Sequence, residues 1–350
     1  DMGYMEIDAL DLRSTQISMH MIKGSQSLED SIAPSKKEDS QSEGQKSFKV
    51  KLNDVLLHDL SFQLLLEQSL SLQSSIGNAA LGDIVFDLAP IDISVGNVEV
   101  DRAFADLRLQ PQMDEPQTVA SSVPLTENDM EEFAEYHPFG GSTPIHVLVS
   151  QMAVNNSNIH LDLDTLSRNP SGIDYSHYDL TNVNVSGSNI HYSPDTINAE
   201  LHTVTATEAC GLSILDLQGN FTLDQHTINA REIKIRTDKS ALSGTAGIRY
   251  QKLSAIGRNM NDLGIFASIS NSWLSVNELN KIYAMDLPIN EKNRLVVDSL
   301  NMDGTLSDLV VSHARFSTGK NTALSSGAYL KGLFTNGPVS LGMHIDTLYT

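Results

Sequence analysis

Three side chains with metal-binding chemistry lie two residues apart in one stretch of the chain. His160, Asp162 and Asp164 alternate with apolar residues over positions 159–164. Alternation at a period of two predicts a β-strand with one polar and one apolar face, so the three polar side chains share a side. Imidazole and carboxylate groups placed in this way could approach a divalent cation. A strand face exposed to water has the same pattern, and we favour that interpretation, so we predict no metal and no cofactor.

Sequence motifs of common enzyme classes are absent from the chain. There is no G-x-S-x-G motif for a nucleophilic serine and no G-x-x-x-x-G-K-[ST] loop for phosphates. Residues 140–143 are rich in glycine and hydroxyl groups, but they contain no lysine and lie among prolines, which is typical of a turn. We therefore expect no catalytic residues and no enzymatic activity.

The charge of the chain excludes several partners. The 350 residues include 23 Lys plus Arg and 44 Asp plus Glu, which gives a formal charge of −21. A surface this acidic repels nucleic acid phosphates and anionic lipid head groups, so neither is an expected docking partner. The single cysteine, Cys210, excludes an intramolecular disulfide. No stretch approaches the roughly 18–20 apolar residues of a membrane-spanning helix.

The elements around His160 belong to a repeated strand pattern. Residues 154–160 and 185–191 share five of seven positions, and an alternating apolar run precedes each copy. Short alternating runs continue along the chain, for example at 91–95 and 98–100 on either side of the polar pair Gly96-Asn97. We interpret such polar pairs as breaks between short strands. The alternating pattern also breaks off at both ends, so we expect a segment of a longer protein.

Three stretches depart from the strand pattern. Residues 24–47 are rich in Ser, Gln, Glu and Lys, which predicts a flexible polar loop. Residues 110–144 form a Pro-rich excursion in which 126–137 could be a short acidic helix. A short helix is also predicted over 276–284, where apolar residues recur at helical spacing. We expect this helix to cap an edge of the sheet, with a plug for one end of the molecule as the alternative.

These signals predict an all-β protein of about 16–20 short strands with one or two short helices. Strands joined by tight turns are antiparallel neighbours, because a parallel crossover needs about a dozen residues. An open sheet of that size rarely stays flat, so it either splits into a sandwich or coils lengthwise into a trough. The internal repeat favours the trough, a single elongated unit over residues 1–350. The apolar face of the sheet is then either a closed core or an open groove for a ligand.

Several phrases in the second half of the chain resemble one known family. They are residues 211–223 (GLSILDLQGNFTL), 233–244 (IKIRTDKSALSG), 269–272, 275–279 and 300–309. Their pattern and rhythm are similar to those of TamB-like members of the AsmA-like superfamily. The likeness is clearest over residues 144–350.

This resemblance implies a fold and a function. Proteins of the family have a long periplasmic β-trough, called a β-taco or super-roll, with an apolar interior and an inner-membrane anchor. They are thought to carry phospholipids towards the outer membrane, and TamB-like members partner an outer-membrane barrel protein of the Omp85 type. The resemblance thus implies a periplasmic, non-enzymatic, lipid-conducting segment that supports phospholipid transport between the two membranes and outer-membrane biogenesis. Its anchor and its barrel-binding part would lie outside the present sequence.

The alternation and the resemblance together predict a lipid-binding groove. Its lining would consist of Ile145, Val147, Val149, Ile159, Leu161, Leu163, Leu215, Leu217, Phe221, Leu223, Ile233 and Ile235. The bound partner would be a phospholipid or another acyl-chain lipid. The alternatives are a structural or adhesive β-solenoid with a closed apolar core and, with thin support from Tyr175, Tyr178 and Tyr192, a glycan-binding sandwich.

Overall fold

The structure is a computed structural model. It describes residues 3–21, 48–66, 70–88, 91–109, 145–162, 167–168, 172–174, 176–251, 263–283, 294–305, 307–318, 322–332 and 339–349. The predicted loop at 24–47, the excursion at 110–144 with its helix at 126–137, and two predicted site residues, Leu163 and Asp164, lie outside these ranges.

Within the described ranges the chain forms sixteen strands and one helix. The strands are β1 (Gly3–Arg13), β2 (Gln16–Met21), β3 (Phe48–Leu66), β4 (Leu70–Leu88), β5 (Ile91–Leu109), β6 (Ile145–Asp162), β7 (His177–Ser193), β8 (Thr196–Glu208), β9 (Ser213–Asp224), β10 (Thr227–Thr237), β11 (Ala241–Arg249), β12 (Gly264–Ser275), β13 (Arg294–Thr305), β14 (Asp308–Thr318), β15 (Thr322–Lys331) and β16 (Ser340–Tyr349). The helix predicted at 276–284 is α3 (Val276–Tyr283). The molecule is therefore all-β.

All sixteen strands belong to one open, elongated sheet. From β3 to β16 the spatial order follows the sequence, with β1 and β2 both beside β3. The pairs β1–β3, β2–β3 and β5–β6 are parallel, and the other pairs are antiparallel. The sheet is thus mixed and not wholly antiparallel as predicted. The parallel pairs follow the two longest gaps between strands, residues 22–47 and 110–144, and gaps of that length let the chain return to the side from which it started.

The polar breaks predicted between strands lie inside single strands. β5 runs without interruption through Gly96-Asn97, and β6 runs through the first copy of the repeat. Eight non-glycine residues within strands have positive φ, and six of these are Asn or Asp, the non-glycine residues that tolerate this conformation best. We call these eight the corner residues: Asp59, Asp83, Arg102, Asn156, Asn182, Asn189, Glu232 and Asn271.

The side-chain alternation changes phase at these corners. Leu52 and Val55 are three residues apart and would point to opposite faces of a regular strand. Both nevertheless belong to one apolar cluster that is built on Val55, Ile84 and Val95. The strand next to them has its corner at Asp83, opposite the interval between Leu52 and Val55. The phase change therefore keeps apolar side chains on one face while the strand bends.

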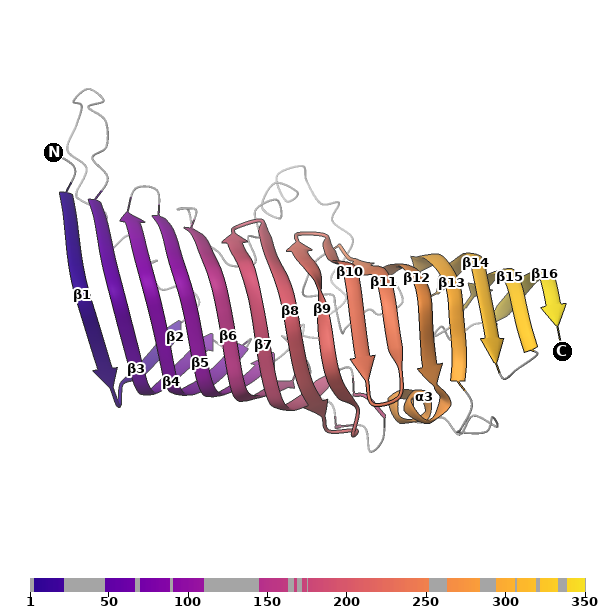
Figure 1. The fold of residues 1–350 in the computed structure, drawn as a ribbon, viewed down its shortest axis with the longest axis horizontal. Helices are drawn as coiled ribbons and strands as arrows, with labels where there is room; N and C mark the ends of the chain where they lie inside the picture. The colour runs from indigo at the N-terminus through magenta and orange to yellow at the C-terminus, as the bar shows by residue number, and fades with distance from the viewer. Residues whose placement is uncertain are drawn as a thin grey trace, which may run out of the picture.

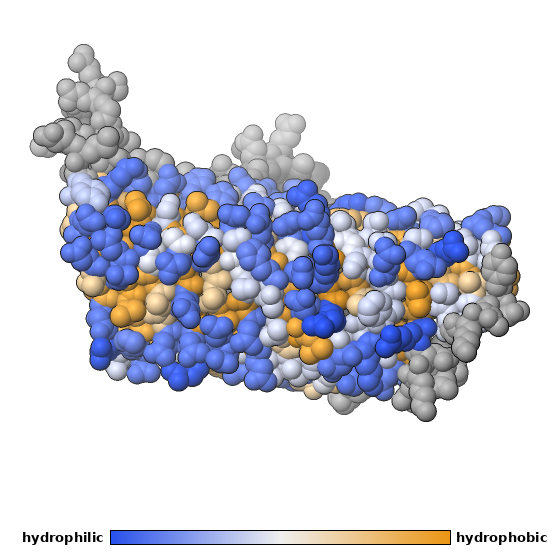
Figure 2. Space-filling model, in the orientation of Figure 1, coloured by the Kyte–Doolittle hydropathy of each residue, from blue (hydrophilic) through white to orange (hydrophobic). Residues whose placement is uncertain are grey.

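The bends turn the sheet into a trough. Figure 1 shows the strands of the N-terminal half turning over at their lower ends and continuing behind the front wall. We call the side that carries the Val55 cluster the inner face and the opposite side the outer face. Figure 2 shows mostly hydrophilic residues on the outer side of the front wall, with an apolar band along its length. Leu56, Phe104 and Leu148 are exposed, and each alternates with an inner-face neighbour, so the outer face as a whole is less uniformly polar than the alternation predicts.

Helix α3 lies at strand ends and covers neither edge strand, which corrects the edge-capping prediction. The buried carboxylate of Glu278 accepts hydrogen bonds from Thr237 Oγ1 (2.7 Å), Lys239 N (3.0 Å) and Ser240 Oγ. Lys281 Nζ donates to Gly211 O at 3.0 Å, and the Ile282 carbonyl accepts from Ile173 N at 2.9 Å. The helix thus links three strand connections along one rim of the trough.

Candidate functional site

The inner face of β5 and β6 contains the first predicted lining residues. Ile145, Val147 and Val149 pair in register with Ile91, Ile93 and Val95. Val149 packs against the Val55 cluster, so this run lies on the inner face.

The predicted lining continues beyond the corner at Asn156. Ile159 and Leu161 pair with Ala105 and Leu107 of β5. Between the two runs, Met152 pairs with Val98, which also packs against the Val55 cluster, and Val154 follows two residues later. Met152 and Val154 therefore belong to the lining, although a strict period of two over β6 misses them.

A buried serine supports this corner and an equivalent one far along the chain. Ser157 Oγ accepts a hydrogen bond from Ala103 N (3.0 Å) and donates to Asn155 O (2.9 Å). Ser272, which follows the corner residue Asn271, accepts from Ser243 N (2.9 Å) and donates to Ser270 O (2.7 Å). Ser157 is 2% exposed and Ser272 is 1% exposed. Each serine satisfies backbone groups that the bend takes out of the strand ladder.

The second half of the predicted lining lies on β9 and β10. Leu217, Phe221 and Leu223 alternate along β9 and pair with Ile235, Ala230 and Ile228. Ile233 is buried beside them and pairs with Gly244. Leu215 is different, because it lies at a register shift between β9 and β10 and is 42% exposed.

Four alanines and one large residue, Phe221, form a cross-strand row on this part of the inner face. The row contains Ala199, Phe221, Ala230, Ala246 and Ala267. The adjacent row consists of larger residues, namely Ile197, Leu223, Ile228, Ile248 and Ile265. Two adjacent rows of apolar side chains therefore run across five strands of the inner face.

The inner face is incompletely covered. Among the described residues only thirteen hydrophobic side chains are buried. Lining residues remain accessible, with Ile145 41% and Ile159 37% exposed. A closed core would bury residues of this kind, so the geometry is that of an open apolar trough.

His160 and Asp162 form a charge cluster on the outer face together with Asp179 and Arg168. The His160 ring forms hydrogen bonds with Asp179 through Nδ1 and with Asp162 through Nε2, the latter at 3.0 Å. Arg168 bridges the same two carboxylates and contacts Asp162 Oδ1 at 3.1 Å. Its guanidinium occupies the place between the carboxylates that a bound cation would need. In the part of the chain that the structure describes, no three His, Cys, Asp or Glu side chains are grouped to hold a metal ion.

Hydrogen bonding controls the pKa values in this cluster. Burial of the His160 ring lowers its pKa, but the hydrogen bonds to Asp179 and Asp162 outweigh this effect and raise the pKa above its ordinary value. Burial likewise raises the pKa of Asp162 and Asp179, and hydrogen bonds from His160 and Arg168 bring the net pKa of both below the usual range. The cluster therefore joins the His160 imidazole and the Arg168 guanidinium to two carboxylates.

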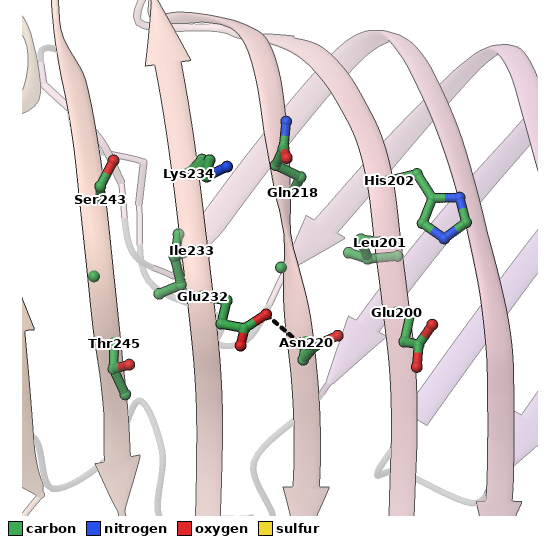
Figure 3. A pocket seen from close by; sticks show the side chains of 12 residues that line it. Glu200, Leu201, His202, Gln218, Asn220, Glu232, Ile233, Lys234, Ser243 and Thr245 are labelled. Atoms are coloured by element: carbon green, nitrogen blue, oxygen red, sulfur yellow. Dashed lines mark hydrogen bonds between the residues drawn. The ribbon is translucent and has the colours of Figure 1, made fainter.

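Figure 3 shows a depression on the outer face over β8 to β11. It has a volume of about 700 Å³, and its polar lining residues include Glu200, His202, Gln218, Asn220, Glu232 and Lys234, with Leu201 and Ile233 also contributing. Its residues come from four strands and share no motif, so no sequence pattern predicts it.

No helix within the described ranges is long and apolar enough to span a membrane. Neither a protein-family model nor a curated protein matches the chain, so the resemblance to the AsmA-like superfamily stays a prediction.

Proposed function

We propose that the chain is a non-enzymatic lipid-binding segment whose inner face holds acyl chains. The observation that supports this most is the phase change at the corners, which keeps the inner face apolar while the strands bend and leaves it open. A sheet that only needed a stable core would have no reason to keep Ile145 and Ile159 accessible.

The energetics of acyl binding suit a surface of this size. Burying one methylene contributes about 0.8 kcal/mol, so a chain of roughly sixteen carbons could gain about 12 kcal/mol before the costs of binding. The front-wall part of β6, residues 145–155, spans about 36 Å at the usual rise of a strand. One wall of the trough is therefore long enough for an extended acyl chain to stay in contact with hydrocarbon.

The resemblance leads to a finer proposal. On that reading, the segment conducts phospholipid between the inner and outer membranes and supports outer-membrane biogenesis. It would act in the periplasm, anchored by a part outside the present sequence, and another such part would meet an Omp85-type barrel. The net charge of −21 fits this role, since it would keep the trough from lying flat on anionic lipid.

A matched pair of substitutions on one strand tests the groove. Leu161 lies on the inner face of β6, and Leu148 lies on the outer face with 40% exposure. We expect Leu161→Asp to abolish binding of a fluorescent phospholipid, because a carboxylate in the groove meets hydrocarbon. Leu148→Asp should bind as the wild type does.

The same pair separates the groove from the rival closed β-solenoid. Urea unfolding followed by circular dichroism should stay cooperative for both variants if the groove is open. Loss of several kcal/mol of stability with Leu161→Asp, together with no lipid binding by the wild type, would support the closed core instead.

A further inference from the structure

The outer-face depression adjoins a second polar hollow, and together they form one surface across β7 to β11. The second hollow has a volume of about 470 Å³ and shares Glu200, Asn220 and Glu232 with the first. It adds further polar side chains, namely Asn189, Asn198, Thr222 and Arg231. We call this combined surface the outer polar site.

The charges of the outer polar site cancel, although the chain as a whole carries −21. Its two carboxylates, Glu200 and Glu232, are matched by Arg231 and Lys234. An anionic ligand would meet the carboxylates and a cationic ligand would meet the two cations. The arrangement therefore suits an uncharged ligand.

The side chains offer donors and acceptors in close alternation. Glu200 pairs across strands with Asn220, and Asn220 pairs in turn with Arg231. Carboxylates only accept, Lys and Arg only donate, and the amides of Asn220 and Gln218 do both. A ligand with many hydroxyl groups matches such a surface, because each hydroxyl both donates and accepts.

Internal hydrogen bonds fix the shape of the site without using all its groups. Asn220 Nδ2 donates to Glu232 at 3.2 Å (Figure 3), and Asn189 Nδ2 donates to Glu200 at 3.0 Å. Each carboxylate has lone pairs beyond these bonds.

We propose that the outer polar site binds a neutral polyhydroxylated ligand, an oligosaccharide being the class that fits best. The polar side chains that carry this inference alternate with the groove residues along β9 and β10, so they lie on the opposite face, although Phe221 and Ile233 line the hollows as well as the groove. Substitution of Glu200 and Glu232 therefore tests sugar binding without changing a groove residue.

Calorimetric titration of the whole chain with neutral oligosaccharides tests the proposal. Suitable probes are maltohexaose, cellohexaose and chitohexaose, with an acidic galacturonate hexamer for comparison. We expect saturable binding of at least one neutral probe, weakened about tenfold or more by the double substitution Glu200→Ala and Glu232→Ala. The matched control is Glu99→Ala, an exposed glutamate on β5 outside the site, which should bind as the wild type does.

Three results would overturn the proposal. They are no binding of any neutral probe by the wild type, unchanged binding by the double variant, and preferential binding of the acidic hexamer. Circular dichroism and phospholipid binding of the double variant should match the wild type, which shows that a loss of sugar binding is local.

Discussion

The inner and outer faces of this sheet are built from the same strands but differ in what the corners do to them. On the inner face the changes of phase keep the surface apolar. Leu52 and Val55 therefore lie on the same face, and so do Val149 and Met152. On the outer face polar groups such as the His160 cluster and the outer polar site alternate with exposed residues such as Phe104. The difference indicates that the fold maintains a continuous apolar surface on the inner face and separate polar contacts on the outer face.

The largest expected contrast comes from two neighbouring residues on β3. Val55 is 6% exposed in the inner cluster, and Leu56 next to it is 43% exposed on the outer face. Val55→Asp should cost about 4 kcal/mol or more or prevent folding, because it buries an unpaired charge. Leu56→Asp should change stability by about 0.5 kcal/mol or less. Urea denaturation of both variants measures the contrast, and equal losses would contradict the assignment of faces.

The corner serines should give a smaller effect at two distant places. Ser157→Ala and Ser272→Ala each leave backbone groups without a partner, so each should cost about 1–3 kcal/mol. Ser150→Ala, an exposed position on β6, is the matched control and should be nearly neutral. If both corner variants unfold at the same urea concentration as the control, the serines do not support the bends.

The outer-face charge cluster should give the smallest effect, and one that depends on pH. The folded-state pKa of His160 is raised, so its contribution is fully present below the unfolded value of about 6.5 and is lost as pH rises through the folded value. His160→Gln should therefore destabilise most below about pH 6.5, and less as pH rises. Thermal unfolding across pH 5–9, with His313→Gln as an exposed control, measures this. A stability difference that grows with pH would contradict the cluster geometry.

The fold class could be predicted because alternation at a period of two dominates the chain. The position of α3 followed from apolar spacing at Val276, Leu279 and Ile282 in the same way. The strand boundaries could not be predicted, because a polar pair inside a strand and a polar pair between strands look alike in sequence. Gly96-Asn97 is such a pair, and β5 continues through it.

The same ambiguity explains what the site prediction missed. A strict period of two from Val149 selects positions 151, 153 and 155 and therefore misses Met152 and Val154. The changes of phase along β6 place these two residues on the inner face. The two copies of the repeat lie on antiparallel neighbours, where only Val154 and Val185 pair at equivalent positions. Each copy of the repeat contains one corner residue, Asn156 or Asn189, and the two copies are not coils of a solenoid stacked in register.

The outer polar site had no signal in the sequence at all. Glu200, Asn220 and Glu232 are brought together by the register of three strands, which depends on where each corner falls. Register of this kind is set by tertiary packing and not by local pattern.

Native mass spectrometry of the purified chain, followed by solvent extraction and lipid analysis, tests the central claim most directly. The open inner face predicts co-purifying phospholipid or fatty acid, and Leu161→Asp should remove it while Leu148→Asp retains it. A lipid-free mass from folded wild-type protein, with no later uptake of a fluorescent lipid, would contradict the account and favour a closed apolar core.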